Sequence, residues 1–209
     1  MTVGAWKSWL ATAAQQPGFR VMEQATIEES DAPLFITQDS RQLEERGPKH
    51  CAFVAIEGHW HDGHHFLHSA YELGARYFIV SKNVSIPWDD VDIVQAPNST
   101  VAWQGLAHHW RTLCGTAIIA ITGSNGKTTV KEMVASIAAS EAPVLATAGN
   151  LNNDIGVPLT LMRLDASHRA AVVEMGANHA GEIRYLCGLA RPRVGVITQA
   201  ASEIGRAHV

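Results

Sequence analysis

A glycine-rich loop is the feature of this sequence that points most directly to chemistry. It reads Gly123-Ser-Asn-Gly-Lys-Thr-Thr129, after an apolar run over 117–122 that predicts a buried strand and before a helix predicted over 127–140. Glycines let backbone N–H groups turn inward around phosphate oxygens, and the start of a helix adds unpaired N–H groups. We expect the Lys127 ammonium to reach the β- and γ-phosphates of a nucleotide and the Thr128 hydroxyl to hold Mg²⁺.

The nucleotide-binding residues predicted from this loop are Gly123, Ser124, Asn125, Gly126, Lys127, Thr128 and Thr129. The loop is a variant, because the strict pattern G-x-x-x-x-G-K-[ST] has glycine where this chain has Ile121. The alternative is an ordinary glycine-rich turn between a strand and a helix. The strand predicted before the loop and the helix predicted after it favour a nucleotide site.

A single acidic residue follows the next buried strand. Glu174 comes directly after the apolar run 170–173, so it stands at the carboxyl end of a strand, where open α/β sheets bind ligands. A carboxylate there can hold Mg²⁺ beside the phosphates, whereas a solvated or capping glutamate is the alternative. We therefore predict Thr128 and Glu174 as metal ligands, and Lys127 and Glu174 as the catalytic pair.

Two further polar groups follow predicted strands. Asn150, Asn152 and Asn153 lie in one loop, where turn chemistry alone explains one asparagine but not the cluster. Asn178 and His179 lie just past the strand that ends near Glu174. Substrate or phosphate contacts are one interpretation of both groups, and a solvent-facing helix start is the alternative for His179.

The elements that must position these residues form two halves. Before Gly115, strands are predicted over 34–37, 51–56, 77–80 and 92–95, with helices near the N-terminus and over 65–74 and 101–113. After Gly115, strands over 117–122, 144–146, 170–175 and 194–198 alternate with helices over 127–140, 156–164 and 181–189. Strands that are apolar on both faces and alternate with helices predict a parallel sheet covered on both sides. The fold class is therefore α/β, with a mixed first domain (1–115) and a parallel-sheet second domain (116–209).

Composition restricts the class of protein. The chain has 209 residues, 16 Lys+Arg and 20 Asp+Glu, so its net charge of −4 argues against a nucleic-acid-binding domain. A hydrophobic content of 46% with 17% charged residues excludes an intrinsically disordered chain. No signal peptide and no apolar run of about 18 residues is present. We expect a cytoplasmic monomer whose three cysteines are reduced and buried.

Six histidines between residues 50 and 68 suggest a metal site. They are His50, His59, His61, His64, His65 and His68. The run His59-x-His61-Asp62-x-His64 approaches a binuclear zinc-hydrolase pattern, but its acid directly follows a histidine, which is the wrong spacing. A zinc hydrolase therefore remains a minor alternative.

Several motifs together resemble one enzyme family. The phosphate loop, the run Gly149-Asn-Leu-Asn-Asn-Asp-Ile-Gly-Val-Pro158 and the run Glu174-Met-Gly-Ala-Asn-His179 resemble the Mur ligases, which are ATP-dependent amide-forming enzymes of bacterial peptidoglycan synthesis. Asp39-Ser40-Arg41 and Asp62-Gly63-His64 are similar to that family's UDP-binding N-terminal domain. The resemblance covers residues 37–198 and looks closest to the members that add D-alanyl-D-alanine to UDP-N-acetylmuramoyl-tripeptide.

The resemblance implies ATP and Mg²⁺ as cofactors and a reaction through an acyl phosphate. It also implies that UDP-MurNAc-peptide and D-Ala-D-Ala are the substrates. The implied substrate-binding residues are Ser40, Arg41, Asp62, His64, Asn150, Asn152, Asn153, Asn178 and His179. For Ser40 and Arg41, which would contact the uracil or ribose, an ordinary polar turn is the alternative.

The end of the chain departs from the family. Mur ligases have a third domain and a lysine, commonly carbamylated, which these 209 residues lack. The family's metal-binding histidine would fall at Ile204, whereas His208 comes four residues later, so His208 receives no metal role. We expect a truncated fragment that binds ligands without ligation, and whose residues 204–209 are hypothesised to be translated sequencing adapter.

Rival functions remain open at this point. Another Mur ligase would add a different amino acid, and a folylpolyglutamate-synthase-like ligase would lack the UDP-binding half. A phosphate-loop ATPase would hydrolyse nucleotide whether or not UDP-sugar peptides are present. A sugar-nucleotide-binding module without catalysis is the last alternative.

Overall fold

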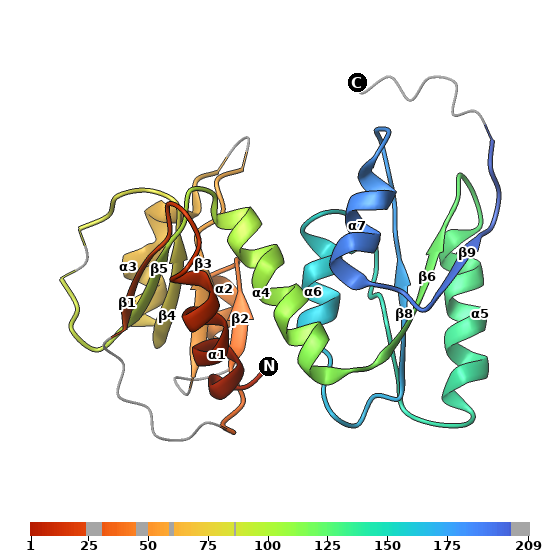
Figure 1. Ribbon diagram of the computed structural model, residues 1–209, viewed down its shortest axis with the longest axis horizontal. Coiled ribbons are helices and arrows are strands. Elements are labelled where there is room, and N and C mark those ends of the chain that lie inside the picture. Colours follow the sequence, from red (N-terminus) through yellow and green to blue (C-terminus); the bar gives the residue numbers. More distant parts are fainter. Residues whose placement is uncertain (24–30, 45–49, 59–60, 86, 202–209) are drawn as a thin grey trace. The chain divides into compact units, whose positions relative to one another are not determined.

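The computed structural model describes residues 1–23, 31–44, 50–58, 61–85 and 87–201. The chain divides into two compact units, Met1–His109 and Trp110–Val209 (Figure 1). This division falls inside helix α4 (Ser99–Cys114), whereas the change of pattern at Gly115 places it after that helix. No described helix is long and apolar enough to cross a membrane.

The first unit is a sheet with helices on both faces. Its elements are α1 (Val3–Ala13), β1 (Arg20–Glu23), β2 (Phe35–Thr37), α2 (Arg41–Glu44), β3 (Cys51–Val54), the 3₁₀ helix η1 (Gly63–Phe66), α3 (Leu67–Glu72), β4 (Ala75–Val80), β5 (Asp92–Gln95) and α4. The strand order is β1-β5-β4-β3-β2, with β2 to β5 parallel and β1 antiparallel to β5. The carboxyl ends of β2, β3, β4 and β5 therefore share one edge.

Adjacent residues of β4 show how both faces of this sheet are covered. Tyr77 meets Trp6 of α1 edge-on, with ring centroids 5.5 Å apart. Phe78 instead belongs to the buried cluster that contains Leu67 and Ala70 of α3. Because neighbouring residues of a strand point to opposite faces, a continuous apolar strand needs this double cover.

The second unit is a four-stranded parallel sheet. Its elements are β6 (Ala117–Thr122), α5 (Lys127–Ala139), β7 (Val144–Ala146), α6 (Gly156–Met162), β8 (Ala170–Glu174), α7 (Glu182–Ala190) and β9 (Val194–Ile197). The strand order is β7-β8-β6-β9, and every pairing is parallel. All four carboxyl ends therefore meet at one edge, and the chain segments that follow them lie there.

Most predicted elements are present, and the differences have local causes. The helix predicted over 65–74 begins instead as η1, in which the His65 N–H donates to the Asp62 carbonyl three residues earlier (3.2 Å), as in a 3₁₀ turn. The Asp62 side chain caps this turn by accepting the His64 N–H (2.9 Å). Gly74, at φ +96°, ends α3 as expected for a C-terminal glycine. β1 and α2 were not predicted, because neither segment contains more than two consecutive apolar residues or a clear periodicity.

The cysteines differ from the expectation of full burial. Cys51 is buried, but Cys114 and Cys187 are only half-buried, and all three are free thiols. Burial raises the pKa of the Cys114 thiol to about 11. That shift keeps this thiol protonated and unreactive at neutral pH.

Candidate functional site

Two glycines shape the phosphate loop between β6 and α5. Gly123 has φ +137° and Gly126 has φ +76°, a region that residues with a side chain rarely adopt. A Cβ on Gly123 would also collide with the Thr198 side chain and lie 2.9 Å from the Gln199 backbone nitrogen. Glycine is therefore required at position 123 both for its conformation and for the close approach of the segment after β9.

The neighbouring strand end holds this loop in place. The Thr198 hydroxyl donates to the Thr122 carbonyl (3.2 Å), and the Thr198 N–H donates to the same oxygen (2.9 Å). The Ser124 N–H and hydroxyl both donate to the Gln199 carbonyl, at 2.9 and 3.2 Å. The sequence motif did not indicate Thr198 and Gln199, because the β6–β9 pairing is what brings them to the loop.

Lys127 folds back over the loop that precedes it. Its ammonium donates to the Gly123 carbonyl at 2.8 Å and lies 3.5 Å from the Ser124 carbonyl. The side chain is half-buried, whereas Asn125, Thr128 and Thr129 are exposed. The cation thus lies inside the loop, within reach of anionic groups that the loop would bind.

Glu174, the last residue of β8, is the buried carboxylate of the site. It is 2% exposed, and each of its carboxylate oxygens accepts one hydrogen bond from a neutral group. The Thr128 hydroxyl donates to Oε2 (2.9 Å), and the Asn152 amide donates to Oε1 (2.8 Å). The Glu174 N–H donates to the Thr147 hydroxyl (3.0 Å). Thr128 and Glu174, both predicted as metal ligands, are therefore in direct contact.

These oxygen donors fit Mg²⁺. Among the described residues, no group of three or more His, Cys, Asp or Glu side chains could form an all-protein metal cage. Mg²⁺ does not require one, because it commonly takes one or two carboxylates, phosphate oxygens and water. The hydroxyl of Thr128 and the carboxylate of Glu174, 2.9 Å apart beside the glycine-rich loop, are oxygen groups of the kind that would hold such an ion.

The three asparagines of the β7–α6 loop have separate positions. Only Asn152 contacts Glu174, and its backbone carbonyl also accepts the Gly176 N–H (2.8 Å). Asn153 accepts the Gly156 N–H at the start of α6 (2.8 Å) through its side-chain oxygen. Asn150 is exposed, and its carbonyl accepts the Asn152 N–H. The structure thus brings Asn152 to the site and places Asn153 at a helix start.

Asn178 and His179 lie before α7, as the helix-start alternative describes. The Glu182 carboxylate accepts both backbone N–H groups, at 2.6 and 3.2 Å. The same carboxylate lies 3.0 Å from Nδ1 of His179, whose side chain is 79% exposed. These contacts, led by the Asn178 N–H, lower the pKa of Glu182. Both residues remain accessible at the carboxyl edge of the sheet.

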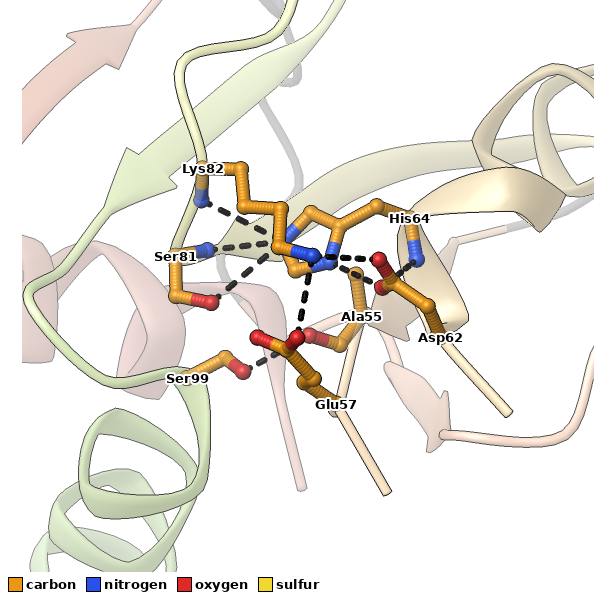
Figure 2. A network of polar contacts seen from close by, with 7 residues as sticks. All are labelled: Ala55, Glu57, Asp62, His64, Ser81, Lys82 and Ser99. Atoms are coloured by element: carbon orange, nitrogen blue, oxygen red, sulfur yellow. Dashed lines mark hydrogen bonds and ion pairs between the residues drawn. The ribbon is translucent and has the colours of Figure 1, made fainter. Parts of the chain in front are cut away.

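In the first unit, a charged network lies at the corresponding edge, after β3 and β4 (Figure 2). The Lys82 ammonium lies 2.5 Å from Oδ2 of Asp62 and 3.1 Å from Oε1 of Glu57. The Lys82 hydrogen bond, followed by the His64 N–H, holds the pKa of Asp62 well below its usual range. Asp62 therefore stays ionised at any physiological pH.

His64 occupies the interior of this network. Its Nδ1 lies 2.6 Å from the Asp62 carboxylate, and its Nε2 accepts the Ser81 N–H at 2.9 Å. Nδ1 therefore carries the proton, and the imidazole side chain is only 4% exposed. A substrate contact through the His64 ring would require one of these bonds to break. In this arrangement His64 connects the loop after β3 to the end of β4.

Ser40 and Arg41 form the turn into α2. The Arg41 guanidinium makes a two-point pair with Asp39, at 2.8 and 2.7 Å, and its side chain is 86% exposed. That hydrogen bond lowers the pKa of Asp39. Because they follow β2, Ser40 and Arg41 lie on the same sheet edge as the Asp62 network.

Three residues of these sites, besides Thr198 and Gln199, were missed from the sequence: Lys82, Thr147 and Lys131. Lys82 comes two residues after β4 and Thr147 directly follows β7, so the strand-end argument that identified Glu174 could have found both. Lys131 is 1% exposed inside α5, and a lysine at a helix position carries no sequence signal of burial.

Part of the histidine cluster and the end of the chain lie outside the residues that the structure describes. Of the six histidines, His59 lies outside the described residues, and the described ones join no candidate metal group. Residues 204–209, including His208, also lie outside the described residues.

Comparisons with known proteins place these features in context. Residues 121–209 match the Mur ligase middle domain. The Escherichia coli K12 UDP-N-acetylmuramoyl-tripeptide–D-alanyl-D-alanine ligase is 40% identical over 169 residues, which are 80% of this chain and 35% of that protein. The chain spans about a third of the length of the curated relatives it matches.

Solved structures give the same result. A crystal structure of MurF from Acinetobacter baumannii has a TM-score of 0.76 and 33% identity, and the match covers all of this chain and 42% of that one. MurF from Thermotoga maritima in complex with ADP has a TM-score of 0.71 and 28% identity, over 81% of this chain and 38% of that one. These similarities confirm the predicted α/β fold and the resemblance stated from the motifs.

Proposed function

Because the chain belongs to the Mur ligase family, we propose that it forms the UDP-substrate-binding and nucleotide-binding parts of an ATP-dependent amide ligase. The proposed reaction adds D-Ala-D-Ala to UDP-MurNAc-tripeptide in the cytoplasm. One observation carries the proposal: Thr128 and Glu174 meet beside the phosphate loop. The two substrates proposed are those that appear in the names of the relatives.

The two units have different proposed tasks. Residues 1–115 bind the UDP end of the substrate through Ser40, Arg41 and the Asp62 network. Residues 116–209 bind ATP through the loop 123–129, and Asn178 and His179 lie open to substrate at the same edge. The ADP complex of the Thermotoga maritima relative supports nucleotide binding in the second unit. We propose a monomer that binds no nucleic acid.

The proposed chemistry has two steps. A carboxylate oxygen of the tripeptide attacks the γ-phosphorus of ATP, ADP leaves, and an acyl phosphate forms. The amine of D-Ala-D-Ala then attacks the acyl carbon and loses a proton to solvent, an amide bond forms, and inorganic phosphate leaves with the bonding electrons. Phosphoryl transfer of this kind depends mainly on positioning and on neutralisation of charge.

The chain's own residues would act as follows. Loop N–H groups and the N-terminus of α5 hold the phosphates. Lys127 exchanges its hydrogen bond to the Gly123 carbonyl for one to a phosphate oxygen. Thr128 and Glu174 hold Mg²⁺, which when bound neutralises charge on the phosphates.

Titration calorimetry of the 209-residue chain tests the proposal. ADP with Mg²⁺, UDP and UDP-MurNAc-tripeptide are titrated separately, and we expect each to bind. UDP should bind equally well when the nucleotide site is already filled with ADP. A phosphate-loop ATPase without ligation chemistry would bind ADP and ignore both UDP ligands, and that result would refute the proposed substrate site.

A further inference from the structure

A hydroxyl group fixes the backbone of Glu174 from the adjacent strand. Thr147 follows β7 directly, and its hydroxyl accepts the Glu174 N–H at 3.0 Å. The Thr147 N–H donates to the Val172 carbonyl at 3.0 Å, so Thr147 is held to β8 at two points. It is 2% exposed and therefore cannot make these bonds with water instead. The orientation of Glu174 at the end of β8 thus depends on Thr147.

A buried cation fixes Thr147 in turn. The Lys131 ammonium donates to the Thr147 carbonyl at 2.8 Å and pairs with Glu132 at 2.8 Å, although its side chain is only 1% exposed. Burial of an ammonium is costly unless it is paired and hydrogen-bonded, as it is here. Lys131 lies one helical turn after Lys127 on α5, so the helix that carries the loop lysine also holds the strand end beside Glu174.

We propose that Thr147 and Lys131 are positioning residues that hold the Glu174 carboxylate opposite Thr128 and thereby set the affinity for Mg²⁺-bound nucleotide. They act through Glu174 rather than by contact with the ligand. Groups that orient a metal ligand commonly change metal affinity about 10- to 100-fold when removed. This inference rests on the proposed nucleotide site, because it concerns the metal ligand of that site.

A merely structural role predicts a different pattern. If Thr147 only stabilised the sheet, its loss would lower thermal stability and weaken all ligand binding to the same extent. A positioning role predicts a selective loss. The contribution of Mg²⁺ to ADP affinity should fall, whereas the affinity for ADP without metal should stay unchanged, since the loop 123–129 binds the phosphates directly.

The test is titration calorimetry of ADP, with and without Mg²⁺, on variants of the full chain. We expect Thr147→Val to reduce the Mg²⁺-dependent gain in ADP affinity about 10-fold or more, and Thr147→Ser to restore it. The control is Thr160→Val, which removes another fully buried hydroxyl, one that bonds the Gly156 carbonyl in α6 and has no contact with Glu174. The control should keep the full Mg²⁺ effect.

Lys131→Met is the second variant, with a similar loss expected, and circular dichroism checks the folding of each protein. If Thr147→Val and Thr160→Val show the same Mg²⁺ effect, the positioning proposal is overturned while the nucleotide site stands. Failure of both Thr147→Val and Lys131→Met to fold would also overturn it, in favour of a structural role. If the unaltered chain binds no ADP, the proposed function fails, and this inference fails with it.

Discussion

The carboxyl edges of the two sheets, which are the proposed sites for phosphate-containing ligands, are built differently. In the second unit, the proposed site consists of backbone N–H groups and one half-buried lysine. Among the described residues no cation pairs with Glu174, which is held by a hydroxyl and an amide. In the first unit, charged side chains already pair with each other, as Lys82 does with Asp62 and Glu57. The fold therefore holds the groups of the proposed site in the second unit. The arrangement of the groups in the first unit depends instead on attraction between charged side chains.

Because of this difference, we expect the two proposed sites to respond differently to salt, pH and mutation. Backbone N–H groups do not titrate, and a loop held by the Thr198 and Gln199 contacts resists small changes of solvent. Ion pairs near the surface are screened by salt and weakened by acid. We therefore expect mutations in the loop to have large effects and mutations in the charged network to have smaller, pH-dependent ones.

The largest effect is expected for Lys127→Ala. A charge-assisted hydrogen bond to phosphate contributes about 2 to 3 kcal/mol, so a non-hydrolysable ATP analogue should bind roughly 30- to 150-fold more weakly. The loss should be smaller for ADP, because the ammonium is aimed at the terminal phosphates. Calorimetry measures both ligands, with the exposed Arg163→Ala as a charge-matched control. Equal losses for the two nucleotides would contradict this geometry.

Next in size is Gly123→Ala. The added Cβ would sit at φ +137° and collide with Thr198, so we expect a loss of about 1 to 3 kcal/mol of unfolding free energy together with nucleotide binding. The matched control is Gly188→Ala in the last turn of α7, where an added Cβ would meet no atom within 4 Å apart from its chain neighbours and the helix's own backbone. That variant should gain about 0.5 to 1 kcal/mol, since alanine favours helix. Urea denaturation distinguishes the two, and a neutral Gly123→Ala would show that the loop tolerates a side chain.

A moderate effect is expected for Asp62→Asn. UDP affinity should fall roughly threefold to fivefold, which is the size of a partly exposed ion pair, while ADP affinity stays constant. Ser40→Ala provides a comparison at the other end of the same edge. If the Asp62→Asn variant binds UDP as tightly as the unaltered chain, the charged network is not part of the UDP site.

The same residue gives a pH dependence. The pKa of Asp62 is lowered in the folded protein, so its contribution to stability is present at neutral pH and is lost as the pH falls below about 4. Thermal unfolding followed between pH 3 and pH 7 should show this decline in the unaltered chain. In the Asp62→Asn variant, the unfolding temperature should fall less as the pH is lowered. If it falls as steeply as in the unaltered chain, other carboxylates cause the loss of stability in acid.

The smallest effect is expected for Glu57→Gln. Its partner Lys82 is 43% exposed and keeps the shorter contact with Asp62, so UDP affinity and thermal stability should hardly change. UDP affinity and thermal stability are measured at low and at high salt concentration and compared with the large effect expected for Lys127→Ala. A large loss at low salt would instead show that Glu57 is needed to hold Lys82.

Local sequence pattern was sufficient for much of the fold and for the centre of the proposed nucleotide site. The glycines, Lys127 and Thr128 follow one another along the chain, so the loop could be recognised without knowledge of its neighbours. Glu174 could be placed because an acid after an apolar strand must lie at the ligand-binding edge of a parallel sheet. Most strands and helices were found by their apolar runs or spacing, including the three-residue β7, whereas β1, with only two consecutive apolar residues, was not.

What surrounds these residues was decided only by tertiary structure. The strand order β7-β8-β6-β9 is not the order of the sequence, and it alone brings Thr147 and Thr198 beside Glu174 and the loop. His64 shows the same limit in the first unit, since a residue type typical of ligand sites turns inward to bond Asp62 and Ser81. Periodicity along a chain fixes which face a residue occupies, but its partners depend on long-range pairing and on burial, because a buried polar group must bond to whatever donor or acceptor the fold places within reach.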